Sequence, residues 1–191
     1  MLELATLGLL QREPLHGYRL KQQLELLMSG CISVNYGAIY PLLKRLEEKG
    51  FLEVCLEEDG HGGNTRKIYQ ITETGRERWK KKMMEHPHES WVHARSRFMI
   101  KFFFFSYIES QERIKLLEHR LKVCQLRLEN QDIEIFSPDS YQSIAWGRCQ
   151  EMLANEILWL EKQIVHEKTK LLPLNSRRKV QLTIKSRVDN G

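Results

Sequence analysis

The sequence predicts a mainly α-helical fold with one small β-hairpin, followed by an antiparallel helical region. Apolar residues recur at helical spacing through most of the 191 residues. Strand-like alternation appears in residues 52–57 and 67–71, on either side of a glycine-rich loop. We therefore expect an N-terminal domain in residues 1–85, a helical domain in residues 86–172 and a basic, flexible tail in residues 173–191.

The first two helices are marked by leucines at helical spacing. The first is a short buried helix that ends near Pro14, because proline has no amide hydrogen and restricts the residue before it. The second covers about residues 17–28, and Gly30 is expected to close it. Together they supply two of the helices of the N-terminal domain.

The third helix has a clear buried stripe. Four apolar residues fall at positions i, i+3, i+4 and i+7: Ile39, Leu42, Leu43 and Leu46. Pro41 lies slightly deeper than the helix position where proline costs nothing, so we expect a kinked or loosened first turn. Ser33 or Asn35 is expected to cap the start, and Gly50 to end the helix in the left-handed conformation.

A hairpin and a fourth helix complete the N-terminal domain. The two strand-like stretches flank the loop, and Thr72 can cap a following helix that carries Trp79 and Met83. Three helices, a two-stranded hairpin and another helix within about 85 residues describe a winged helix-turn-helix.

Composition excludes several classes of protein. The net charge of +5 allows a polyanionic partner, although residues 1–85 hold 13 Lys and Arg against 12 Asp and Glu. The apolar run in residues 98–108 is too short to span a membrane and contains Lys101. The four cysteines lie far apart without a C-x-x-C pair, which is typical of buried thiols in a reducing cytoplasm: Cys31, Cys55, Cys124 and Cys149.

Neither a metal site nor catalysis is expected. His86, His88 and His93 lie close together, but Pro87 prevents a simple helical ligand pair and no cysteine is near. No phosphate-binding loop, nucleophile elbow or zinc-protease motif is present. We therefore expect a cytoplasmic protein that is not an enzyme and needs no cofactor.

Three segments of the N-terminal domain stand out: "LHGYRL" (15–20), "YGAIYPLLKRLEEKGFLE" (36–53) and "RKIYQITETGRE" (66–77). In sequence, order and separation they resemble the segments that mark the PadR family of bacterial transcriptional regulators. The rest resembles the long helical dimerisation region of the subgroup that includes the virulence activator AphA. The resemblance implies a sequence-specific DNA-binding regulator, expected to repress as a homodimer on a pseudo-palindromic operator.

The resemblance also implies where DNA would be contacted. The third helix would enter the major groove, and the wing would touch the flanking backbone or minor groove. The candidate DNA-binding residues are Tyr18, Ser33, Asn35, Tyr36, Tyr40, Lys44, Arg66 and Lys67. The alternatives without DNA contact are packing of the tyrosines against the second helix and solvation of the charged side chains.

The C-terminal helices are expected to pair two subunits. Apolar residues repeat at alternating spacings of three and four in two helices, as in a coiled coil. The candidate dimerisation residues are Phe102, Phe105, Leu117, Leu121, Leu128, Trp146, Leu153, Ile157, Leu160 and Ile164. The alternative for this region is a bundle within one chain.

Two further expectations concern partners. PadR-type regulators often respond to small aromatic or hydrophobic molecules, and a pocket near Trp91, Trp146 or the phenylalanine cluster would suit one. The alternative function is a protein-interaction module that keeps the winged-helix scaffold and works through its helical arms. Near neutrality of residues 1–85 would permit this second function.

Overall fold

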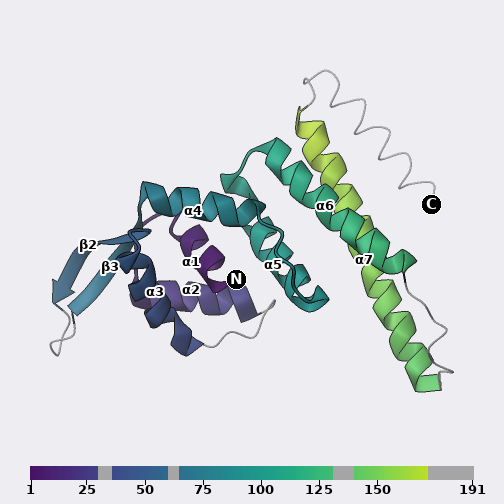
Figure 1. The fold of residues 1–191 in the computed structure, drawn as a ribbon, viewed down its shortest axis with the longest axis horizontal. Coiled ribbons are helices and arrows are strands. Elements are labelled where there is room, and N and C mark those ends of the chain that lie inside the picture. The colour runs from purple at the N-terminus through teal and green to yellow at the C-terminus, as the bar shows by residue number, and fades with distance from the viewer. Residues whose placement is uncertain (30–35, 60–64, 131–139, 172–191) are drawn as a thin grey trace. The chain divides into compact units, whose positions relative to one another are not determined.

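A computed structural model describes residues 1–29, 36–59, 65–130 and 140–171 (Figure 1). The chain forms two compact units, Met1–Ile108 and Glu109–Gly191, referred to below as unit 1 and unit 2. The expected functional boundary near residue 85 stays a prediction. Gly30, Ser33, Asn35 and the tail in residues 173–191 lie outside the described residues.

Most of the described elements belong to unit 1, and the described part of unit 2 consists of two helices. The elements of unit 1 are α1 (Leu2–Leu9), β1 (Leu15–His16), α2 (Gly17–Ser29), η1 (Tyr36–Ala38), α3 (Ile39–Glu48), β2 (Leu52–Asp59), β3 (Thr65–Ile71), α4 (Glu73–Met84), α5 (Trp91–Phe103) and η2 (Phe105–Tyr107). Those of unit 2 are α6 (Ser110–Glu129) and α7 (Ser140–Leu171). The mainly helical winged-helix fold class is confirmed.

Helix α3 has the predicted buried stripe and the predicted end. All four stripe residues are at most 4% exposed. Pro41 is less deep in the helix than predicted: α3 begins at Ile39, so Pro41 lies in the first turn, where a missing amide hydrogen costs no intrahelical bond. The 3-10 helix η1 directly precedes α3. At the other end Gly50 has a φ of 70°, and its amide and that of Phe51 each donate a 2.9 Å hydrogen bond into the last turn of the helix.

The sheet has three strands rather than the predicted two. Strands β2 and β3 form the expected antiparallel hairpin, and β1 pairs with the other edge of β3 through Leu15 and Tyr69. The sequence did not reveal β1 because two residues are too few to show alternation. This short strand fixes the start of α2 beside the wing.

The core of unit 1 joins α4 to α5 and to the segment that follows. Thr72 caps α4 as predicted, because its hydroxyl accepts a 3.1 Å hydrogen bond from the Gly75 amide. Trp79 of α4 packs edge-on against Phe104, with ring centroids 6.3 Å apart. Residues up to Ile108 therefore share one core with the winged helix.

A buried charge lies at the junction of α4 and α5. Lys101 is 3% exposed, and its ammonium donates a 2.5 Å hydrogen bond to the carbonyl oxygen of Glu85. The pKa of Lys101 is lowered to about 8, mainly by burial and also by the nearby Arg97, while Glu89 and Glu85 oppose the shift. Stability of unit 1 should therefore depend on pH in the alkaline range.

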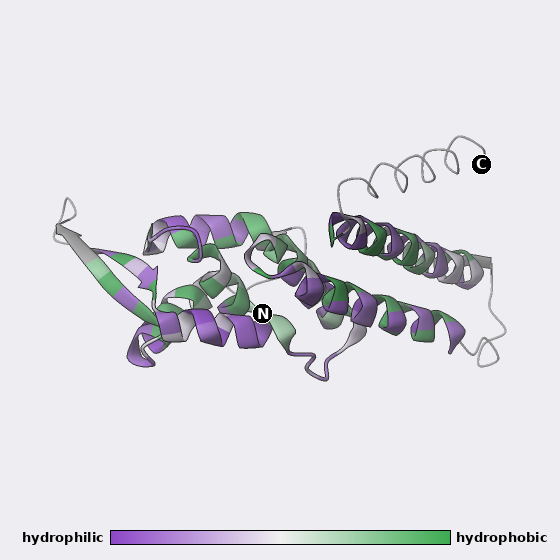
Figure 2. Cartoon of the chain, turned by 90° about the horizontal axis from the view of Figure 1, so that it is seen from above, coloured by the Kyte–Doolittle hydropathy of each residue, from purple (hydrophilic) through white to green (hydrophobic). Residues whose placement is uncertain are grey.

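Unit 2 is an antiparallel hairpin held by an apolar seam and ion pairs. Arg120 pairs with Glu156 at 2.8 Å and Arg113 with Glu167 at 3.3 Å, so early residues of α6 face late residues of α7. Figure 2 shows apolar and hydrophilic bands along both helices. The buried apolar residues of the seam are Leu116, Leu117, Cys124, Leu153, Leu160 and Ile164.

The seam is shorter than the sequence predicted. Trp146 and Leu128 were expected within it, yet they are 42% and 39% exposed. The two ion pairs place Glu129, the last residue of α6, level with about residues 147 to 151 of α7. The start of α7 therefore extends beyond α6, as Figure 1 shows.

The expectation of buried cysteines is wrong for two of them. Cys124 is buried, whereas Cys55 and Cys149 are exposed. Cys55 alternates with Val54 and lies on the solvent side of β2, and Cys149 lies where the pairing of α6 and α7 ends. Cys31 lies outside the described residues.

Candidate nucleic-acid interface

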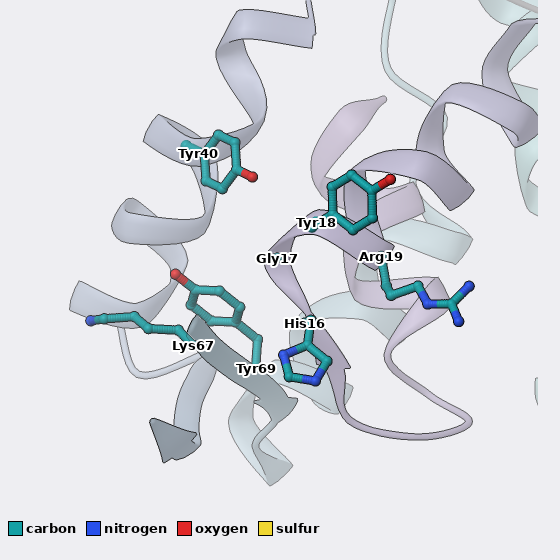
Figure 3. Close-up of a pocket in the computed structure, with 7 residues that line it drawn as sticks. All are labelled: His16, Gly17, Tyr18, Arg19, Tyr40, Lys67 and Tyr69. Atoms are coloured by element: carbon teal, nitrogen blue, oxygen red, sulfur yellow. The ribbon is translucent and has the colours of Figure 1, made fainter. Parts of the chain in front are cut away.

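Three segments that are distant in the sequence form one groove on unit 1. The groove has a volume of about 680 Å³ and lies between the start of α2, helix α3 and strand β3 (Figure 3). Its lining residues are His16, Gly17, Tyr18, Arg19, Tyr40, Lys67 and Tyr69. Each of the three segments that carry the family resemblance contributes to it.

Two exposed tyrosines flank the groove. Tyr40 is 53% exposed and lies on α3 outside the buried stripe. Tyr18, in the first turn of α2, is 63% exposed, and its hydroxyl oxygen accepts a 2.6 Å hydrogen bond from the Gln22 amide. This bond leaves the Tyr18 hydroxyl hydrogen available to an acceptor such as a phosphate oxygen.

Gly17 forms the floor of the groove between two aromatic rings. A Cβ placed there would lie 3.4 Å from ring atoms of both Tyr40 and Tyr69. Figure 3 shows Tyr40 facing the start of α2 across the groove, with Tyr69 and Lys67 supplied by β3. Tyr69 is buried, so it supports the groove rather than projecting from it.

Cations and carboxylates lie close together on the exposed side of α3. Lys44 and Glu48 lie one turn apart on α3, with their charged atoms at 3.9 Å, and both side chains are mostly exposed. Lys67 of β3 lies 3.5 Å from Glu47 of α3. Lys44 and Lys67, two of the cations predicted to contact DNA, thus each lie beside a carboxylate of α3.

The structure brings some of the predicted residues together and leaves others undescribed. Tyr18, Tyr40 and Lys67 share the groove, whereas Lys44 lies on the exposed side of α3. The structure places the backbones of Tyr36 and Arg66 in η1 and β3, and it does not describe their side chains.

The sequence predicted no role for Arg19 or Tyr69, which both line the groove. Arg19 directly follows Tyr18 in "LHGYRL", and that proximity was the available signal. The sequence indicates only that Tyr69 is an inward-facing strand residue. Its position in the groove depends on the pairing of β3 with β1, which the sequence did not predict.

Comparison with known proteins shows a family match in the N-terminal part of the chain. Residues 6–81 match the profile of the Transcriptional regulator PadR-like family. Over residues 6–81 the chain is therefore similar to PadR-like transcriptional regulators. The PadR-like family consists of transcriptional regulators rather than enzymes, as the sequence predicted.

Proteins named PadR are similar to this chain over most of its length. The negative transcriptional regulator PadR of Bacillus subtilis (strain 168) is 26% identical over 174 residues, which cover 84% of this chain and 94% of the relative. The structure of B. subtilis PadR with operator DNA shows 23% identity and a TM-score of 0.43, over 87% of this chain and 98% of that chain. The structure with p-coumaric acid shows 24% identity and a TM-score of 0.40 over the same shares.

Metal binding and membrane spanning can both be considered for the described residues. Among the described residues, no group of three or more His, Cys, Asp or Glu side chains could hold a metal ion. None of the described helices combines the length and apolar character that crossing a bilayer requires.

Proposed function

We propose that this PadR-like protein is a sequence-specific DNA-binding repressor that acts as a homodimer on a pseudo-palindromic operator. The observation that carries the proposal is the groove, in which the start of α2, the exposed side of α3 and the wing meet on one face of unit 1. The curated relative is named a negative transcriptional regulator, and a solved relative is bound to operator DNA, which supports the proposal. A role on DNA agrees with the predicted cytoplasmic location.

In the proposed complex α3 lies in the major groove and unit 1 contacts both base edges and phosphates. Tyr40 and Tyr18 donate their hydroxyl hydrogens, and Lys44, Arg66 and Lys67 neutralise phosphates. The helix α2 adds its N-terminal partial positive charge at the groove. Ser33, Asn35 and Tyr36 stay predicted contacts at the start of the recognition segment.

The proposed homodimer forms through α7. Most of the predicted dimerisation residues of unit 2 are buried or half-buried within the hairpin of one chain, and Phe102 and Phe105 belong to unit 1. A second apolar stripe lies on the opposite side of α7, at spacings of seven or fourteen residues. It consists of Ile144, Leu158 and Val165, which are 69%, 54% and 43% exposed.

Exposed apolar residues on this stripe favour a second copy as the covering partner. A heptad spacing is the pattern by which helices pair over several turns. Pairing through α7 would hold two copies of unit 1 at a fixed separation, as a pseudo-palindromic site requires. The seam residues of the hairpin then give α7 its shape, while the outer stripe makes the contact.

The proposed effector is a small aromatic molecule that binds in unit 1. A cavity of about 690 Å³ lies among α1, α2, α5 and η2, and its lining includes Arg12, Leu26, Met99, Phe102, Phe103 and Tyr107. The aromatic side chains suit a planar ring, and Arg12 suits a carboxylate. The structure of a relative with p-coumaric acid supports this choice of ligand class.

Selection of genomic fragments by the purified protein tests the proposed function. Bound fragments are sequenced, and sedimentation measures the mass of the free and DNA-bound protein. We expect one enriched pseudo-palindrome and a mass of two chains. Indifference to every fragment, together with stable capture of a protein partner, would instead favour the interaction-module alternative.

A further inference from the structure

An acidic side chain lies beside the wing lysine at the edge of the groove. Glu47, in the last turn of α3, holds its carboxylate oxygen 3.5 Å from the ammonium of Lys67 on β3. The two side chains are 34% and 40% exposed, so the pair is partly shielded from water. In contrast, Lys44 and Glu48 are 79% and 61% exposed and lie on a single helix, so water screens them more strongly.

Helix stability does not account for a carboxylate at position 47. The C-terminal end of a helix carries a partial negative charge, which disfavours Asp and Glu in the last turn. The partner of Glu47 belongs to a different element, the wing strand, and that partner lines the groove. The Glu47 carboxylate therefore acts mainly on the charge and position of Lys67 in the wing.

The charge balance of the N-terminal domain points in the same direction. Residues 1–85 carry 13 basic and 12 acidic side chains. Sequence-independent DNA binding arises almost entirely from cations that neutralise phosphates. A regulator must find its site among a large excess of other DNA, so weak sequence-independent binding is an advantage.

We propose that Glu47 is a specificity-determining residue that restrains sequence-independent DNA binding. Its carboxylate holds the Lys67 ammonium and repels an approaching phosphate, so a phosphate gains the Lys67 contact only by displacing Glu47. At the operator, base contacts from α3 fix the register that makes this exchange favourable. On other DNA those base contacts are missing, so the exchange of Glu47 for a phosphate is unfavourable. The inference rests on the proposed function.

Binding to a duplex of mixed sequence tests the inference. Fluorescence anisotropy of the full-length protein with a labelled duplex, about 30 base pairs long, is measured between about 50 and 200 mM salt. We expect Glu47→Gln to bind several-fold more tightly than the wild type. The slope of log K against log salt should become steeper by about 0.9, the value for one additional phosphate contact. Glu47→Ala is a second variant and should show the same gain.

The gain must depend on Lys67 and not on net charge. The double variant Glu47→Gln, Lys67→Ala should bind like Lys67→Ala alone. Glu77→Gln on α4 changes the net charge equally at an exposed carboxylate on a helix that contributes no residue to the groove, and it should bind like the wild type. Circular dichroism melting verifies that each variant is folded.

Three results would overturn the inference. They are weaker or unchanged binding of Glu47→Gln, an equal gain in Glu77→Gln, or a gain that persists without Lys67. Such a result in a protein whose wild type selects a genomic operator refutes only the role of Glu47. A wild type that selects no genomic fragment refutes the proposed function itself.

Discussion

The two units use their apolar residues in opposite ways. In unit 1 the buried stripe of α3 holds the helix, and the exposed polar and aromatic side of the same helix forms the proposed interface. In unit 2 one apolar stripe of α7 is buried against α6, and a second apolar stripe is exposed. An amphipathic helix thus presents a polar surface for the proposed DNA contact in one unit and a further apolar surface for the proposed second copy in the other.

The largest expected effect separates the two stripes of α7. Leu160 is fully buried in the hairpin, whereas Leu158 is 54% exposed on the outer stripe. Leu160→Ala should lower the free energy of unfolding by about 3 kcal/mol, because it removes packed atoms and leaves a cavity. Thermal and chemical denaturation followed by circular dichroism measures the change.

Leu158→Ala is the matched variant on the outer stripe. We expect little loss of hairpin stability at concentrations where the protein is monomeric, but a weaker dimer in sedimentation experiments. Equal losses of folding stability in the two variants, with an unchanged dimer, would remove the distinction between an inner and an outer stripe.

A smaller effect compares one glycine in each unit. A Cβ at Gly75 would lie 2.1 Å from the backbone oxygen of Phe51, which cannot move freely, whereas a Cβ at Gly147 on α7 would meet nothing within 4 Å. Gly75→Ala should destabilise unit 1 by about 2 kcal/mol through overpacking. Gly147→Ala should be neutral or stabilise its helix by up to about 1 kcal/mol. Differential scanning calorimetry on both variants checks the signs.

These contrasts show which features a sequence can supply. The stripe of α3, its end at Gly50 and the Thr72 cap all depend on residues within a few positions of one another, and all were predicted. The pair of Glu47 and Lys67 was not, because the residues are 20 positions apart and their approach depends on how β3 packs beside α3. The exposure of Trp146 likewise depends on where α6 ends relative to α7.

A further difference in stability concerns alkaline pH and is expected in unit 1. The pKa of Lys101 is about 8 in the folded protein against an ordinary value of 10.5, mainly because of burial. Between these values the unfolded chain binds the proton and the folded chain does not, so stability should rise from about pH 8 to about pH 10.5. Lys101→Met should flatten this rise in urea denaturation curves. If stability rises equally in the variant, other titratable groups cause the rise.

Operator binding by two tyrosine variants tests the central claim most directly. Tyr40 on α3 and Tyr141 on α7 are both exposed, at 53% and 82%, and they lie in different units. Fluorescence anisotropy measures the affinity of Tyr40→Ala and Tyr141→Ala for the operator selected from genomic fragments. The account predicts at least roughly tenfold weaker binding for Tyr40→Ala, as expected for the loss of one DNA contact, and wild-type binding for Tyr141→Ala. Wild-type affinity in a folded Tyr40→Ala variant would contradict the placement of α3 on DNA.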